Sequence, residues 1–115
     1  MSNTKYNQSH KDVLDKMLLD NPIVKPGKMF GYPGYYVGGK LFACVYENGV
    51  GIKVPESMAN ELLEREEIVH FQPYGRKKMR KWIQINRQNS EDYRQGKGIF
   101  EASIMYVSKI AGLEP

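Results

Sequence analysis

Cysteine, histidine and long apolar runs are scarce in this chain. Cys44 is the only cysteine, so no internal disulfide forms and a reducing cytoplasm is the expected compartment. The two histidines, His10 and His70, lie far apart without a spaced set of partner ligands, so we expect no metal site. No apolar run approaches membrane-spanning length, and the polar start of the chain does not resemble a signal peptide. We therefore expect a cytoplasmic protein with no cofactor and no membrane contact.

Signatures of common enzymes are also missing. No serine lies in a nucleophile elbow, and the glycines of residues 31–34 and 96–98 do not form a phosphate-binding loop. Glu64, Glu66 and Glu67 are typical of a solvated surface rather than of an acid-base pair. We predict no catalytic residue and favour a non-enzymatic function.

What the chain does have is a local excess of positive charge. The formal net charge is +4, and one short segment holds five of the basic residues: Arg76, Lys77, Lys78, Arg80 and Lys81. This segment falls in a predicted turn between two strands. It either attracts a phosphate backbone or an acidic partner, or it is a solvated turn.

Residues 28–54 form the stretch around which the fold is organised. Gly38-Gly39 and Asn48-Gly49 accept the positive φ values of two-residue hairpin loops, so they predict a three-stranded antiparallel meander. The Pro33-Gly34 pair is expected to bend or break the first strand.

The predicted register gives this meander two apolar faces. Val45 lies opposite Ile52 on one face. The other face carries an aromatic set that forms a candidate interface: Tyr35, Phe42, Tyr46 and, from a later strand, Trp82. Because a small domain normally covers one face of a sheet, this second face suggests a partner, a ligand or further helical cover.

Cys44 is predicted on the same aromatic face, opposite Lys53, with Gly51 leaving space beside Tyr46. A nearby lysine lowers the pKa of a thiol, which makes this corner a candidate pocket for a small ligand or a reaction. The alternative is that Cys44 is a small buried apolar residue.

The whole pattern predicts an α+β domain. We expect a flexible tail over residues 1–8, a helix from near Ser9, the meander, a helix after Pro55 and strands over 68–74 and 81–87. A last helix, capped by Asn89 or Ser90, should weaken at Gly96 and Gly98. The order is α-β-β-β-α-β-β-α, with an antiparallel sheet of about five strands and flanking helices. Residues 9–115 form a single domain by size.

Several short motifs occur together in this chain: Lys28-Met29-Phe30-Gly31, Gly34-Tyr35-Tyr36, Gly39-Lys40, Phe42-Ala43, Lys53, Phe71, Tyr74-Gly75-Arg76 and Met79-Arg80-Lys81-Trp82. In this order they resemble the N-terminal domain of the TfoX/Sxy family, the bacterial competence regulators and their single-domain relatives. The resemblance covers most of the chain from Ser9 onward. It implies an α+β domain similar in topology to type III secretion chaperones, with a regulatory role and no known catalytic site.

The sequence departs from the family pattern at Gly38 and Gly51. Full-length family members also carry a second, C-terminal domain, and this chain reaches only Pro115. Competence regulation is therefore not transferred, and a separate C-terminal domain stays an open question.

Three functions remain open at this point. The first is an interaction or regulatory module that forms a homodimer, or binds another protein, through the sheet face. The second is a nucleic-acid-binding accessory protein that uses the basic segment 76–81. The third is a small-ligand carrier or enzyme with a pocket near Cys44.

Overall fold

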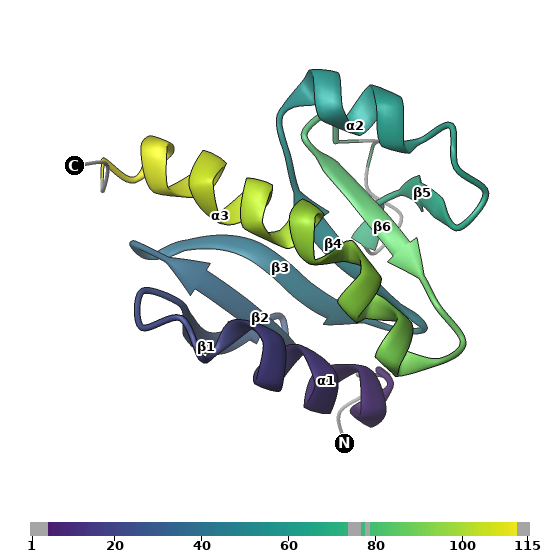
Figure 1. Ribbon diagram of the computed structural model, residues 1–115, viewed down its shortest axis with the longest axis horizontal. Helices are drawn as coiled ribbons and strands as arrows, with labels where there is room; N and C mark the ends of the chain where they lie inside the picture. The colour runs from purple at the N-terminus through teal and green to yellow at the C-terminus, as the bar shows by residue number, and fades with distance from the viewer. Residues whose placement is uncertain (1–4, 74–76, 78, 113–115) are drawn as a thin grey trace.

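The computed structural model describes residues 5–73, 77 and 79–112 and has an α+β fold (Figure 1). Its elements are α1 Gln8–Leu18, β1 Lys25–Met29, β2 Tyr32–Val37, β3 Lys40–Tyr46, β4 Gly49–Lys53, α2 Glu56–Leu62, β5 Ile68–His70, β6 Trp82–Asn86, the 3₁₀ helix η2 Ser90–Gly96 and α3 Lys97–Ile110. The strands form one antiparallel six-stranded sheet in the order β1-β2-β3-β4-β6-β5. The predicted fold class and antiparallel sheet are confirmed.

The sixth strand arises because the first predicted strand is a hairpin. Phe30 and Gly31 have φ values of 51° and 90°, so the chain reverses there, and Met29 pairs with Tyr32. Two consecutive left-handed residues make a tight turn whose twist matches that of the strands. The predicted break at Pro33-Gly34 is therefore wrong, since both residues lie within β2.

Of the two later turns, one forms at the predicted residues and the other lies one residue earlier than predicted. Gly38-Gly39 forms the two-residue turn between β2 and β3, and Tyr36 lies opposite Leu41 as expected. The next turn uses Glu47 and Asn48 instead of Asn48-Gly49, so Val45 pairs with Val50 rather than with Ile52. A shift of two residues keeps the predicted faces but changes every partner.

A β-bulge at Phe42 corrects the predicted face of that residue. Tyr35 pairs with Ala43 and Tyr36 pairs with Leu41, which leaves Phe42 as an extra residue on β3. A bulge lets two consecutive side chains point to the same side of a sheet. Phe42 and Ala43 therefore both face the helices, and Phe42 does not share a face with Cys44.

Two of the helical elements, α1 and η2, begin at side-chain caps. The Asn7 side chain accepts from the N–H groups of Ser9 and His10, so α1 starts at Gln8, slightly before the predicted start. Tyr6 bridges to Glu47 within residues that were expected to form a tail. Asn89, one of the two predicted caps, caps η2, and α3 proper begins after Gly96. In the described residues, no helix has the length and apolar character needed to cross a bilayer.

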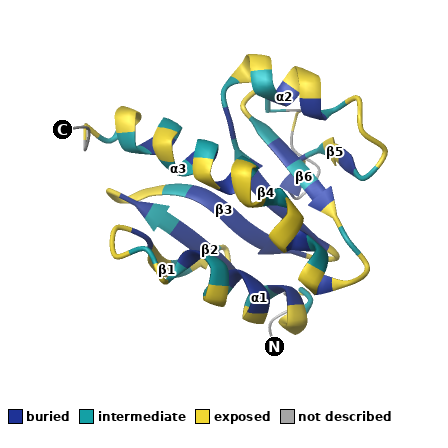
Figure 2. Ribbon diagram, viewed as in Figure 1, coloured by how far each residue is buried: buried dark blue, intermediate teal, exposed yellow. Residues whose placement is uncertain are grey.

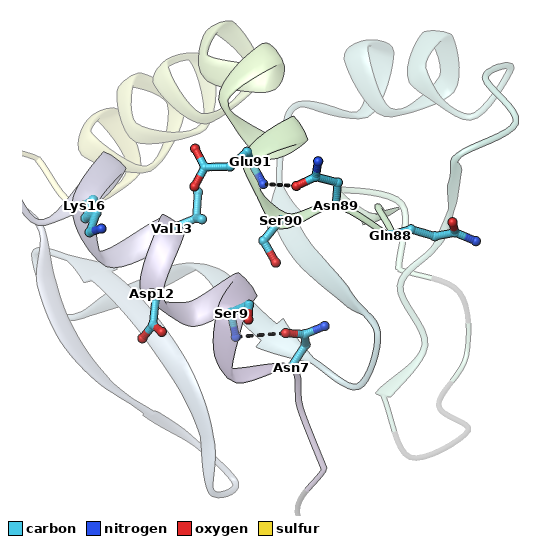
Figure 3. Close-up of a pocket in the computed structure, with 9 residues that line it drawn as sticks. All are labelled: Asn7, Ser9, Asp12, Val13, Lys16, Gln88, Asn89, Ser90 and Glu91. Carbon is cyan, nitrogen blue, oxygen red and sulfur yellow. Dashed lines mark hydrogen bonds between the residues drawn. The ribbon is translucent and has the colours of Figure 1, made fainter.

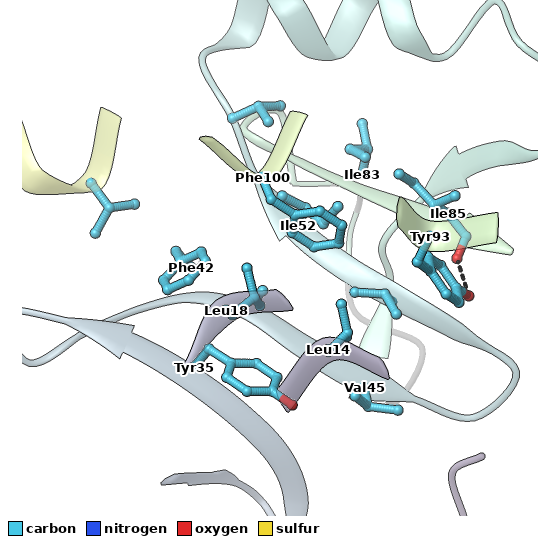
Figure 4. Close-up of a cluster of buried hydrophobic side chains, with 14 of the residues drawn as sticks. Leu14, Leu18, Tyr35, Phe42, Val45, Ile52, Ile83, Ile85, Tyr93 and Phe100 are labelled. Atoms are coloured by element: carbon cyan, nitrogen blue, oxygen red, sulfur yellow. Dashed lines mark hydrogen bonds between the residues drawn. The ribbon is translucent and has the colours of Figure 1, made fainter. Parts of the chain in front are cut away.

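The main hydrophobic core lies between the sheet and the helices. Side chains from α1, α3 and η2 meet the inward side chains of the strands, among them Leu14, Phe100, Tyr93, Val45 and Ile83 (Figure 4). Burial is concentrated in the middle strands of the sheet, whereas the outer sides of the helices are exposed (Figure 2). One sheet face is thus covered by helices, which leaves the other face to be closed by different means.

Candidate functional site

The sheet face opposite the helices carries a second hydrophobic cluster, which we call the aromatic face. Its members are Tyr32, Cys44, Tyr46 and Phe71, with Tyr6, Met29, Leu41, Met79 and Trp82 packed against them. Among the described residues, none of these side chains belongs to a helix. The strands and the segment after β5 therefore cover this face with their own side chains.

The rings of the aromatic face form a continuous series of contacts. The Tyr32 and Tyr46 ring centroids are 4.6 Å apart, Tyr46 and Phe71 meet edge to face at 5.5 Å, and Phe71 and Trp82 lie 5.3 Å apart. Such distances are those of stabilising aromatic pairs. The cluster is thus ordered by ring packing from β2 to β6.

Two rings on this side of the sheet, those of Phe71 and Tyr36, pack directly against glycine residues. A Cβ atom on Gly51 would lie 2.9 Å from the Phe71 ring, and one on Gly27 would lie 2.8 Å from the Tyr36 ring. Both rings therefore occupy the space of a missing side chain. This arrangement brings them close to the backbone of the sheet.

Among the described residues, the surroundings of Cys44 differ from those of the predicted pocket. Cys44 pairs with Gly51, whereas Lys53 pairs with Trp82, so the expected lysine is not opposite the thiol. The Phe71 ring fills the space over Gly51. Burial raises the pKa of the Cys44 thiol to about 12, which opposes the lowering that Lys53 was expected to cause.

The four aromatic residues of the predicted interface do not lie together. Tyr35 and Phe42 are buried in the helix-covered core, with exposed fractions of 1% and 0%. Tyr46 lies on the aromatic face but is also buried, and Trp82 there is partly exposed. The grouping on one face was wrong because it assumed that side chains alternate strictly along the strand, and the bulge at Phe42 interrupts that alternation.

The predicted basic segment is described only in part. Lys77, Arg80 and Lys81 are exposed, whereas Arg76 and Lys78 lie outside the described residues. The Lys81 carbonyl accepts from the Val54 N–H at 2.9 Å. Lys81 therefore lies beside the end of β4, directly before Trp82 in β6.

Trp82, which directly follows the basic segment, is the last member of a row of side chains that crosses the sheet. Lys25 pairs with Tyr36, Tyr36 pairs with Leu41, and Lys53 pairs with Trp82. Leu41 and Lys53 lie on the neighbouring strands β3 and β4, just beyond the Ala43 and Ile52 pair. We call these five residues the cross-sheet row: Lys25, Tyr36, Leu41, Lys53 and Trp82.

The cross-sheet row is accessible along its whole length. Lys25 is exposed, and Tyr36, Leu41, Lys53 and Trp82 are partly exposed. All five side chains lie on the aromatic face, because paired residues of neighbouring strands share a face. The row therefore presents two cations and two aromatic rings to the outside.

Sequence reasoning missed Lys25 as a site residue and considered Lys53 only beside Cys44, although a signal was present. Between residues 25 and 53 the only acidic residue is Glu47, and between residues 68 and 87 there is none. Glu47 lies in the turn at the opposite end of β3 from Lys40. Positive charge thus collects at one end of the sheet, well beyond the basic segment itself.

A second, polar site lies between α1 and η2. A depression of about 430 Å³ is lined by Asn7, Ser9, Asp12, Val13, Lys16, Gln88, Asn89, Ser90 and Glu91 (Figure 3). Next to it, the buried His10 ring contacts Ser90 through Nδ1 at 2.6 Å and the Asn48 carbonyl through Nε2 at 3.2 Å. A carbonyl oxygen only accepts, so Nε2 carries the proton and the Ser90 hydroxyl donates to Nδ1.

This serine and histidine pair lacks the surroundings of a nucleophile. The Glu91 N–H donates to Asn89, and the Ser9 and His10 N–H groups donate to Asn7, so none of the three is free to stabilise an oxyanion. His10 is also 1% exposed. Burial lowers the pKa of His10, the largest effect on that ring. The pair joins α1, η2 and the β3–β4 turn, which is a structural role.

The described residues also lack a metal centre, since they contain no group of three His, Cys, Asp or Glu side chains close enough to bind an ion. Comparison of the chain with protein-family models, curated proteins and solved structures gave no match.

Proposed function

We propose that this chain is a non-enzymatic interaction module that binds an acidic partner across its aromatic face. The observation that carries the proposal is the cross-sheet row, in which Lys25 and Lys53 are accessible beside two aromatic side chains. The short motifs that resemble the TfoX/Sxy N-terminal domain support the same class of function, a regulatory binding domain of the bacterial cytoplasm.

The distribution of acidic residues supports an acidic partner on this side. Apart from Glu47, the described acidic residues lie in helices, near helix ends or in the connection between α2 and β5: Asp12, Asp15, Asp20, Glu56, Glu61, Glu64, Glu66, Glu67, Glu91, Asp92 and Glu101. The helix side and the sheet side thus carry charge of opposite sign. An anionic partner is attracted to the sheet side and repelled from the helices.

A homodimer through the aromatic face is the second candidate, favoured by the partly exposed Trp82. In a two-fold dimer the same patch meets itself, so Lys25 and Lys53 would approach a second set of cations. Like charges across an interface oppose association. Sedimentation tests this candidate, because Trp82→Ala should shift a dimer toward the 13.3 kDa monomer. A monomeric wild-type chain would remove it.

The acidic-partner proposal is tested by retention on heparin, a sulfated polyanion. We expect the double variant Lys25→Gln and Lys53→Gln to elute at clearly lower salt than the wild-type chain, because two accessible cations are removed from the binding face. The matched control removes two exposed lysines of the helix side, Lys16→Gln and Lys97→Gln. Equal shifts for the two variants would show that net charge alone governs retention, and the proposal would fail.

A further inference from the structure

We infer that the acidic partner is a single-stranded nucleic acid that lies along the cross-sheet row. This inference rests on the proposed function, because it names the partner of the same face. Phosphates would contact Lys25 and Lys53, and bases would stack on Tyr36 and Trp82.

The spacing of the cations suits an extended polyanion. The row starts on β1 and ends on β6, four strand steps away in the sheet order. Neighbouring strands are about 4.8 Å apart, so the row is roughly 19 Å long, and Lys53 lies roughly 14 Å from Lys25. A chain of phosphates that crosses the strands meets one cation at the start of this path, Lys25, and a second at Lys53.

The rings in the row distinguish a nucleic acid from an acidic peptide. An acidic peptide would satisfy the lysines but would leave Tyr36 and Trp82 without a matching group. Bases stack on aromatic side chains whatever their sequence, and each stacked base contributes to affinity. The alternation of cation and ring along the row is therefore the pattern of a nucleic-acid surface.

Both rings are held in place before any ligand arrives. The Tyr36 ring lies over Gly27, and the Tyr36 hydroxyl donates to the Lys28 carbonyl. The Trp82 ring packs beside Phe71 with an angle of 35° between the ring planes. Ordered rings lose little conformational entropy on binding, which favours stacking.

A single strand fits this face better than a duplex. Side chains that enter a duplex groove project from a helix or a two-stranded ribbon, whereas the row lies within a six-stranded sheet. Unpaired bases can instead be laid on rings at a sheet surface, as they are on sheets that bind RNA through aromatic side chains.

The inference is tested by fluorescence anisotropy with a labelled, mixed-sequence single-stranded oligonucleotide at low salt. We expect binding that weakens with salt. Because Lys25→Gln and Lys53→Gln each leave one phosphate without its cation, the salt slope should fall by about 0.7 in either variant. Trp82→Leu should lower affinity roughly tenfold, the effect of removing one stacked base. Tyr36→Leu gives the same test at the other ring if Trp82→Leu fails to fold.

Control measurements distinguish a failure of the nucleic-acid inference from a failure of the acidic-partner proposal. The variant Lys16→Gln with Lys97→Gln should bind the oligonucleotide like the wild type. Labelled polyglutamate and a labelled duplex of the same sequence are measured in parallel. Equal or tighter binding of polyglutamate or duplex, or unchanged affinity in both ring variants, would overturn the inference while the acidic-partner proposal stands. No binding of any of these polyanions at low salt would overturn both.

Discussion

Single glycine residues decide how closely side chains approach the sheet. Gly49 pairs with Asn86 in β6, and a Cβ atom on Gly49 would lie 2.8 Å from the Ile85 carbonyl oxygen. Backbone atoms of a central strand move less easily than a side chain does, so this position excludes any larger residue.

We expect Gly49→Ala to lower the free energy of unfolding by about 1–3 kcal/mol, because the new methyl group overpacks a well-filled region. Gly98→Ala is the control, since a Cβ atom there meets nothing within 4 Å. Gly98 lies in α3, where alanine should raise the free energy of unfolding by about 0.5–1 kcal/mol. Urea unfolding measures both values. A neutral Gly49→Ala variant would contradict the close packing of β4 on β6.

Among the elements, the hairpin of β3 and β4 carries local backbone strain, as the β1–β2 turn does at Phe30. Glu47 has a φ of 51° at its turn, a left-handed conformation that costs residues with a side chain about 1–2 kcal/mol. The Glu47 N–H donates to the Lys5 carbonyl, so the turn also holds the residues that precede α1. The hairpin thus sets the register of the aromatic face and the entry of the first helix.

Glu47→Asn should relieve part of this strain, because asparagine tolerates the left-handed region better than glutamate does. We expect the midpoint of urea unfolding to rise, with a gain of up to about 1 kcal/mol. Glu47→Gln removes the same charge but keeps the long side chain, so it should change stability by less than about 0.5 kcal/mol. An equal gain in both variants would assign the effect to charge rather than to backbone conformation.

Across the whole molecule, the stability of the fold should depend on pH through His10. This buried ring links α1 to η2 and to the β3–β4 turn, and burial holds its pKa below the ordinary value of 6.5. A depressed folded pKa means that the unfolded state binds a proton first as the pH falls. The stabilising contribution is therefore complete above about pH 6.5 and is lost as the pH decreases toward the folded pKa.

We expect the free energy of unfolding to fall between about pH 6.5 and 5 by at most about 1.4 kcal/mol per pH unit from this one proton. His10→Gln should show a flatter dependence in the same range, because the carboxylates titrate alike in both proteins. Thermal unfolding at several pH values gives the comparison. Parallel pH curves for the two proteins would show that His10 does not titrate in this range.

The separation of charge is the other property of the whole molecule. Lys25 and Lys53 lie on the aromatic face, and most of the described acidic residues belong to the helices. The sequence shows that acidic residues are scarce between residues 25 and 53, but it does not show which side chains become neighbours. Lys25, Lys53 and Trp82 are far apart along the chain and come together only through strand pairing.

The sequence by itself determined the α+β class, the Gly38-Gly39 turn and the helical start near Asn89. These features depend on residues within one or two turns of chain, so local chemistry is sufficient to specify them. Only the tertiary structure decided the bulge at Phe42, the shifted turn at Glu47 and the cross-sheet row. Register and bulges depend on how distant strands pack, as Gly49 does against Ile85 and Gly51 against Phe71.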